Sequence, residues 1–122
     1  MIGHTRWTIA EGYLPPDDDA SKSRALVSHE AFCVLNPNDR DADIEMTIYY
    51  GDREPVGPYR MKVAARRTVH FRFNDLSDPE PIPVGTDYAS VITASVPIVV
   101  QHTRLDSRSG TIALMTTMAY PG

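Results

Sequence analysis

The strict alternation of residues 43–50 is the feature that most constrains the fold. In the run DIEMTIYY, Ile44, Met46 and Ile48 point to one side of an extended chain, and Glu45 and Thr47 point to the other. This pattern predicts a half-buried antiparallel strand. Three further alternating runs occupy residues 6–10, 59–63 and 67–73.

Other segments predict strands with less regular patterns. Residues 30–36 (EAFCVLN) are apolar on both faces, which is typical of a strand covered on both sides, and we expect this strand to form a hairpin with residues 43–50. Residues 87–95 and 98–103 predict two strands broken by Pro97, with the IVV segment in a central, doubly covered strand. Residues 111–120 predict a final strand or a short helix, and their threonines favour the strand.

The sum of these patterns is seven to eight short strands with little or no helix. Such a chain is expected to close its core as an all-β, antiparallel two-sheet β-sandwich, with an open, barrel-like variant as the alternative. A length of 122 residues predicts a single domain over residues 1–122. A hydrophobic content of 42% is that of an ordinary globular protein.

The remaining composition predicts a reduced, cytoplasmic protein. No apolar run approaches the roughly 20 residues that span a bilayer, and no secretory signal is visible at the N-terminus. The one cysteine, Cys33, lies in an apolar strand pattern and is expected to be a small buried hydrophobe. Residues 15–24 (PPDDDASKSR), the acidic loop, predict a mobile surface loop without the ligand spacing of a calcium site.

Catalytic and metal chemistry find little support in the sequence. The four histidines lie more than twenty residues apart, whereas metal sites in small β-proteins usually cluster their ligands. One alternative stays open: His29, Glu30 and His102 can form a metal site if the fold brings them together. No strained nucleophile turn and no glycine-rich phosphate loop is present. We therefore expect no catalytic residues, no metal and no cofactor, and a protein that is not an enzyme.

Binding is the favoured class of function. Residues 49–74 carry six of the twelve cationic residues, although the whole chain has a net charge of −4. Bulk charge therefore does not support DNA binding, which would need one cationic face presented several times by an oligomer. Tyrosines and Trp7 near loop acids are also chemically suited to a polar ring ligand such as a sugar.

Five segments carry a resemblance to a known family: WTIAEGYLPP (7–16), SHEAFCVLN (28–36), IYYGDREPVGPYR (48–60), ARRTVHFRFNDLSDPEPIP (65–83) and ASVITASVPIVVQHTRLDSR (89–108). In these segments the chain resembles the sensory rhodopsin transducer family. The resemblance implies a β-sandwich that assembles as a cyclic homotetramer and acts as a soluble cytoplasmic signalling adaptor. Its implied partner is the cytoplasmic face of a microbial rhodopsin, and carbohydrate binding and promoter-DNA binding are alternatives. The acidic loop and residues 111–122 depart from the family pattern.

The predicted binding surface combines the loop at residues 52–59, the turn at residues 102–108 and, nearby, residues 7–13. These segments hold the polar groups that packing explains least, because the groups lie in otherwise apolar or proline-fixed sequence. Arg104 and Asp106 could equally form a buried structural pair. The predicted ligand- or partner-binding residues are Trp7, Glu11, Tyr13, Asp52, Arg53, Glu54, Tyr59, His102, Arg104, Asp106 and Arg108.

Overall fold

Eight strands and one short 3₁₀ turn make up the chain in a computed structural model that describes residues 1–122. The strands are β1 (His4–Tyr13), β2 (His29–Asn36), β3 (Ala42–Tyr50), β4 (Val56–Val63), β5 (Arg67–Arg72), β6 (Asp87–Asp106), β7 (Ala113–Met118) and β8 (Tyr120–Pro121), and η1 (Phe73–Asp75) follows β5. The all-β prediction and the final strand are confirmed. The chain forms no helix long and apolar enough to cross a membrane.

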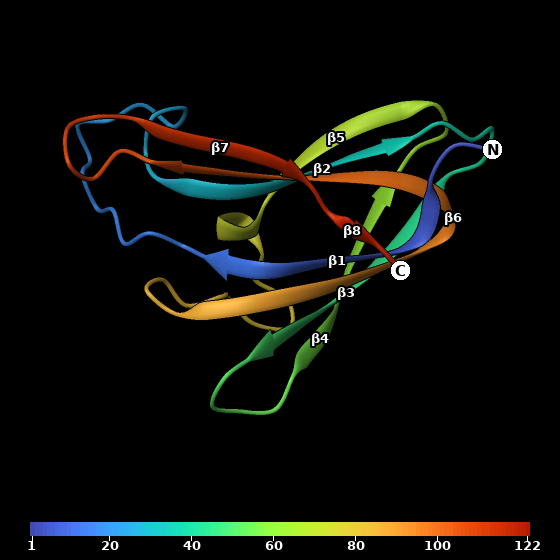
Figure 1. Cartoon of the computed structure of the whole chain (residues 1–122), viewed down its shortest axis with the longest axis horizontal. Coiled ribbons are helices and arrows are strands. Elements are labelled where there is room, and N and C mark those ends of the chain that lie inside the picture. Colours follow the sequence, from blue (N-terminus) through green and yellow to red (C-terminus); the bar gives the residue numbers. More distant parts are fainter.

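The strands form two layers that share β6. Sheet A has the order β4-β3-β6-β1-β8, and in sheet B the strand β2 lies between β5 and β6, with β7 on the other side of β6. At about 3.3 Å per residue, the 20 residues of β6 span roughly 66 Å, which is long enough to serve both sheets. Figure 1 shows β5, β2 and β7 in one layer and β1, β3 and β4 in the other. This arrangement is the predicted antiparallel β-sandwich.

The predicted break at Pro97 is wrong, because β6 passes through this residue without interruption. Pairing of β6 with β3 ends at Ala94, and pairing with β2 begins at Val99. Pro97 therefore lies where β6 leaves one sheet for the other, at a position where no neighbouring strand needs its missing N–H group. Its carbonyl oxygen accepts a 2.6 Å hydrogen bond from the Asn38 side chain. The IVV segment is central in sheet B, as expected.

The predicted hairpin between residues 30–36 and 43–50 is also wrong. β2 pairs with β5 and β6 in sheet B, whereas β3 pairs with β4 and β6 in sheet A. The fully buried Asn36 holds the chain in place where it passes from sheet B to sheet A. Its amide nitrogen donates to the carbonyl oxygens of Arg40, Val63 and Ala64 at 2.8–3.3 Å. The turn residues between the two runs therefore connect two sheets instead of two paired strands.

The core lies between the sheets and is centred on aromatic side chains. Phe32 on β2 and Phe73 in η1 are fully buried, with ring centroids 4.8 Å apart, and Phe73 packs against Tyr88 at 5.3 Å. The outer face of sheet B is not covered by any other part of the chain. Cys33 and Val99 are half-buried there and Leu35 is 41% exposed, so β2 and the IVV segment are covered on one face only.

The acidic loop is held against the sandwich instead of lying free in solvent. The Asp17 carboxylate, whose side chain is 4% exposed, accepts hydrogen bonds from Lys22 Nζ at 2.7 Å and from the Ser28 backbone and hydroxyl groups at 2.9 Å. These contacts, led by Lys22, hold the pKa of Asp17 well below its usual range. Lys22 Nζ also donates to the Ser107 carbonyl at 3.0 Å, which ties the loop to the end of β6.

Candidate functional site

A buried carboxylate is the most unusual group inside the sandwich. Alternation along β2 directs Glu30, Phe32, Val34 and Asn36 into the interior, and Glu30 is the one charged residue among them. Its side chain is 0% exposed. Burial of an unpaired carboxylate is strongly unfavourable, so Glu30 must be compensated by neighbouring donors.

Four groups from two strands, β1 and β6, surround the Glu30 carboxylate. Oε1 accepts hydrogen bonds from Tyr88 Oη at 2.6 Å and from the Tyr13 backbone N–H at 3.0 Å. Oε2 accepts a hydrogen bond from Arg104 Nε and lies 3.5 Å from His102 Nε2. We call Glu30, Tyr88, His102 and Arg104 the Glu30 cluster.

The cluster keeps Glu30 ionised. Burial alone would raise the pKa of this carboxyl group, but the donors around it, led by His102 and Tyr88, outweigh burial and lower the pKa. The pKa of the Tyr88 hydroxyl is raised in turn, first by burial and then by the neighbouring negative charge of Glu30. Tyr88 therefore stays protonated and donates to the carboxylate.

Two nitrogen atoms of the cluster have no partner. His102 Nε2 and Arg104 Nη2 are both buried and make no hydrogen bond within the chain. The His102 side chain is 3% exposed and the Arg104 side chain 21% exposed. Buried polar groups in folded proteins are nearly always paired, so these two unpaired nitrogens set the Glu30 cluster apart from the rest of the core.

An open groove between β1 of sheet A and β7 of sheet B is lined in part by His102. It has a volume of about 220 Å³, and its lining residues are Thr8, Ile9, Ala10, Glu11, His102, Met115, Thr117, Met118, Ala119 and Tyr120. β8 pairs with β1 only at Trp7 and Thr8, so this side of the sandwich stays open beyond that point. Arg104 lines a second hollow next to it, and the two hollows share Met115.

The structure brings six of the predicted binding residues near this groove. His102 and Glu11 line it, Arg104 and the Tyr13 backbone bind Glu30, and Asp106 forms a 2.8 Å ion pair with Arg108 beyond Arg104. Arg108 lowers the pKa of Asp106 through this contact. Arg104 and Asp106 thus each pair with a different residue and not with one another.

The other five predicted residues lie elsewhere. Asp52, Arg53 and Glu54 are exposed at the tip of the β3–β4 hairpin, where the Arg53 guanidinium group stacks 3.9 Å from the centre of the Tyr50 ring. Trp7 is buried, with Nε1 bonded to the His4 and Ile98 carbonyl oxygens. Tyr59 is 1% exposed, and its hydroxyl donates to the Glu80 carbonyl oxygen at 2.8 Å. Neither ring presents a face to a ligand.

Sequence reasoning missed several residues of the site. Glu30 was considered only as a metal ligand, and Tyr88, Met115, Thr117 and Tyr120 were not singled out. A signal for Glu30 was present, because it is a charged residue in the strongly apolar run EAFCVLN. The others carry no such signal, since a tyrosine or methionine in a β-strand is ordinary.

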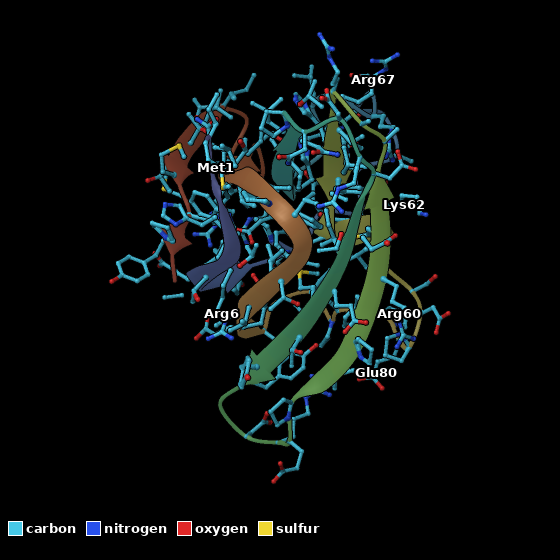
Figure 2. All side chains as sticks on the ribbon, turned by 90° about the vertical axis from the view of Figure 1, so that its right-hand side faces the viewer. Met1, Arg6, Arg60, Lys62, Arg67 and Glu80 are labelled. Carbon is cyan, nitrogen blue, oxygen red and sulfur yellow. The ribbon has the colours of Figure 1, made fainter.

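Acidic side chains lie next to most of the cationic residues of residues 49–74, which we call the cationic stretch, and largely neutralise their positive charge. On β4, Arg60 lies 3.5 Å from Glu45, and Lys62 lies 3.3 Å from Asp43. Figure 2 shows Arg60 and Lys62 along the outer edge of the sandwich. Exposed pairs of this kind contribute little to stability, but they reduce the positive field of this face.

The chain matches one protein family and is similar to solved structures of other proteins. Residues 2–121 match the family described as Anabaena sensory rhodopsin transducer. Among solved structures, the chain is 62% identical to the Anabaena sensory rhodopsin transducer, over 89% of this chain and 94% of that one, with a TM-score of 0.79. It is 32% identical to the Thermotoga maritima protein 1070, over 100% of this chain and 97% of that one, with a TM-score of 0.87. No curated protein sequence matches the chain.

Proposed function

Because the chain belongs to the Anabaena sensory rhodopsin transducer family, we propose that it is a cytoplasmic signalling adaptor that acts by binding and not by catalysis. The observation that carries this proposal is the family match over nearly the whole chain, together with 62% identity to a protein named as a transducer. The partner that the name implies is a microbial rhodopsin, through its cytoplasmic face.

The β3–β4 hairpin tip is the surface that we propose for the receptor. Asp52, Arg53 and Glu54 are exposed, so burial in the core does not account for them. Stacking on Tyr50 holds Arg53 in place. In Figure 1 this hairpin projects away from the rest of the sandwich, which leaves it accessible to a flat membrane-protein surface.

Titration of the chain against purified Anabaena sensory rhodopsin in nanodiscs tests the receptor proposal. We expect the double variant Arg53→Ala with Glu54→Ala to weaken binding about tenfold, which corresponds to about 1.4 kcal/mol. The matched control removes the exposed ion pair on the stem of the same hairpin, Arg60→Ala with Glu45→Ala. Absence of any interaction with the receptor, or equal losses in both double variants, would refute the proposal.

Assembly as a homotetramer is the second part of the proposal. The uncovered outer face of sheet B supports it, because Cys33, Leu35 and Val99 form an apolar strip there that no part of the chain covers. Light scattering coupled to size-exclusion chromatography measures the mass directly, and Leu35→Lys is expected to reduce it. A monomeric wild-type protein at micromolar concentration would contradict the assembly.

The geometry gives less support to the carbohydrate and promoter-DNA alternatives. Of the aromatic residues suited to stacking on a sugar (Trp7, Tyr13, Tyr49, Tyr50 and Tyr59), Trp7 and Tyr59 are buried and hydrogen-bonded, and Tyr49 is exposed. DNA binding would use the cationic stretch, in which Arg60 and Lys62 face acids. A DNA complex would lose affinity steeply as salt is raised, which a mobility-shift titration measures.

A further inference from the structure

The last long strand, β7, is an open edge of sheet B. It pairs with β6 along one side, and no strand pairs with its other side. Its ladder with β6 runs from Ala113 to Met118 without a register shift, and all six of its residues are exposed. β7 therefore presents a row of backbone N–H and C=O groups that no other strand of the chain satisfies.

β7 lacks the features that protect the other edges of the sandwich from pairing. Edge strands are usually protected by charged side chains, proline, a bulge or a very short length. The outer strand β4 carries Pro58, Arg60 and Lys62, and the outer strand β5 carries Arg67 and Arg72. β8 is two residues long, and the part of β1 beyond β8 contains a register shift. The sequence ALMTTM of β7 has no charge and no proline, which indicates that another strand pairs with this edge.

The open backbone groups limit what can cover this edge. A lipid surface is poorly matched, because hydrocarbon offers no hydrogen bonds to backbone N–H and C=O groups. A small molecule is also poorly matched, because six residues of strand extend over roughly 20 Å. An extended strand satisfies the whole row. No residue from 109 to 121 has a charged side chain, so the strand that fits this edge is uncharged as well.

The sequence of this edge is matched to itself. Antiparallel pairing of two copies about Thr116 places large apolar residues opposite one another, Ile112 with Tyr120 and Leu114 with Met118. Leu114, Thr116 and Met118 lie opposite Leu105, Thr103 and Gln101 of β6, on the outer face of sheet B. Each opposed pair therefore joins residues of the same face, as a sheet requires. A second copy of β7 meets both conditions, since it is extended and uncharged.

We propose that β7 pairs with β7 of a second copy of this chain, antiparallel and about a two-fold axis at Thr116. The contact is isologous, because the same strand is used by both copies. It joins the β5, β2, β6 and β7 strands of each copy into one continuous sheet. The proposal goes beyond the assembly proposed above, which uses the outer face of sheet B and not its edge.

Oxidative cross-linking locates the axis. Cys33→Ser removes the one native cysteine, and in this background Thr116→Cys places two thiols directly opposite one another. Leu114→Cys is the matched control on the same strand and face, because its two copies would lie about 13 Å apart along the strand direction. We expect about tenfold more disulfide-linked dimer from Thr116→Cys than from Leu114→Cys at micromolar protein. Equal yields, or no linked dimer from Thr116→Cys, would overturn the proposal.

Charge exchange at the axis separates strand pairing from a damaged fold. Thr116→Lys and Thr116→Glu each place like charges opposite one another, so each alone should weaken self-association about fivefold in sedimentation equilibrium. An equimolar mixture pairs lysine with glutamate and should associate within about twofold of the wild-type protein. Thr93→Lys and Thr93→Glu are the controls at an exposed position of sheet A and should have no effect. Unweakened association in both Thr116 variants, or weakening that the mixture does not relieve, would overturn the proposal.

The same measurement distinguishes the edge from the outer face of sheet B. Leu35→Lys changes the outer face, whereas the two Thr116 variants change the edge, and circular dichroism confirms that each variant is folded. Association that is weakened by Leu35→Lys alone removes the edge proposal and leaves the proposed assembly in place. Association that is weakened by the Thr116 variants alone supports the edge and removes the outer face.

Discussion

Replacement of Tyr88 by phenylalanine tests whether the Glu30 cluster stabilises the fold in the way its geometry indicates. The substitution deletes one hydroxyl group, which donates a 2.6 Å hydrogen bond to a fully buried carboxylate. Hydrogen bonds to charged groups contribute about 1.5–3 kcal/mol, so we expect a loss of about 2 kcal/mol in the free energy of unfolding at pH 7. In a domain of this size that loss lowers Tm by roughly 8 °C.

The pH dependence of this loss follows from the pKa of Glu30. That pKa lies below the ordinary value of 4.5, so the ionised carboxylate contributes stability that is fully present above about pH 4.5 and is lost as pH falls through the folded-state pKa. Once Glu30 is protonated, the Tyr88 hydroxyl makes only a neutral hydrogen bond, which contributes about 1 kcal/mol. The difference between the two proteins should therefore narrow by about half in acid.

Urea denaturation at fixed protein concentration measures both effects. Trp7 is the one tryptophan of the chain and is 4% exposed, so its fluorescence reports unfolding. Tyr49→Phe is the control, because Tyr49 is 44% exposed and its hydroxyl group makes no hydrogen bond within the chain; it should change stability by less than about 0.5 kcal/mol. A Tyr88→Phe protein as stable as this control, or a loss independent of pH, would refute the reasoning.

Three further predictions use other parts of the fold. Asn36→Ala should lower the free energy of unfolding by about 2 kcal/mol in urea titrations, because it leaves the buried Val63 carbonyl oxygen and the part-buried carbonyl oxygens of Arg40 and Ala64 without their donor. Gly12→Ala should cost about 1–3 kcal/mol, since its Cβ would lie 2.4 Å from the Tyr88 ring, whereas Gly51→Ala has open space and should be neutral; calorimetry compares the two. Asp17→Ala should release the acidic loop and speed its cleavage by trypsin, and an unchanged cleavage rate would show that the loop is held by other contacts.

Local patterns in the sequence, alternation above all, were sufficient to predict the fold class and most of the strands. Residues 43–50 alternate because one face of β3 packs into the core, so the pattern reports which side chains are buried. The final strand could be predicted from its threonines, and the family could be recognised from segments such as residues 48–60. These properties are local, because each depends on residues that are neighbours along the chain.

Only the tertiary structure decided which strands are neighbours. Alternation assigns side chains to faces but does not specify the pairing partner, so two consecutive runs on opposite sheets look the same as a hairpin. The deciding element is β6, which is long enough to separate β2 from β3 by pairing with both. Pro97 was predicted to break the strand because proline has no N–H group to donate to a neighbouring strand. Only the tertiary structure shows that β6 changes sheet at this point, where no neighbouring strand needs that N–H group.

The candidate site depends on the tertiary structure for the same reason. Glu30 meets Tyr88 and Arg104 across 58 and 74 residues of sequence, and no local pattern encodes these distances. The sequence determined that a carboxylate occupies an interior position of an apolar strand. Whether that carboxylate is an unpaired charge, a metal ligand or a fully hydrogen-bonded anion depends on the groups that other strands place around it, because the environment of a buried charge sets its pKa and its stability.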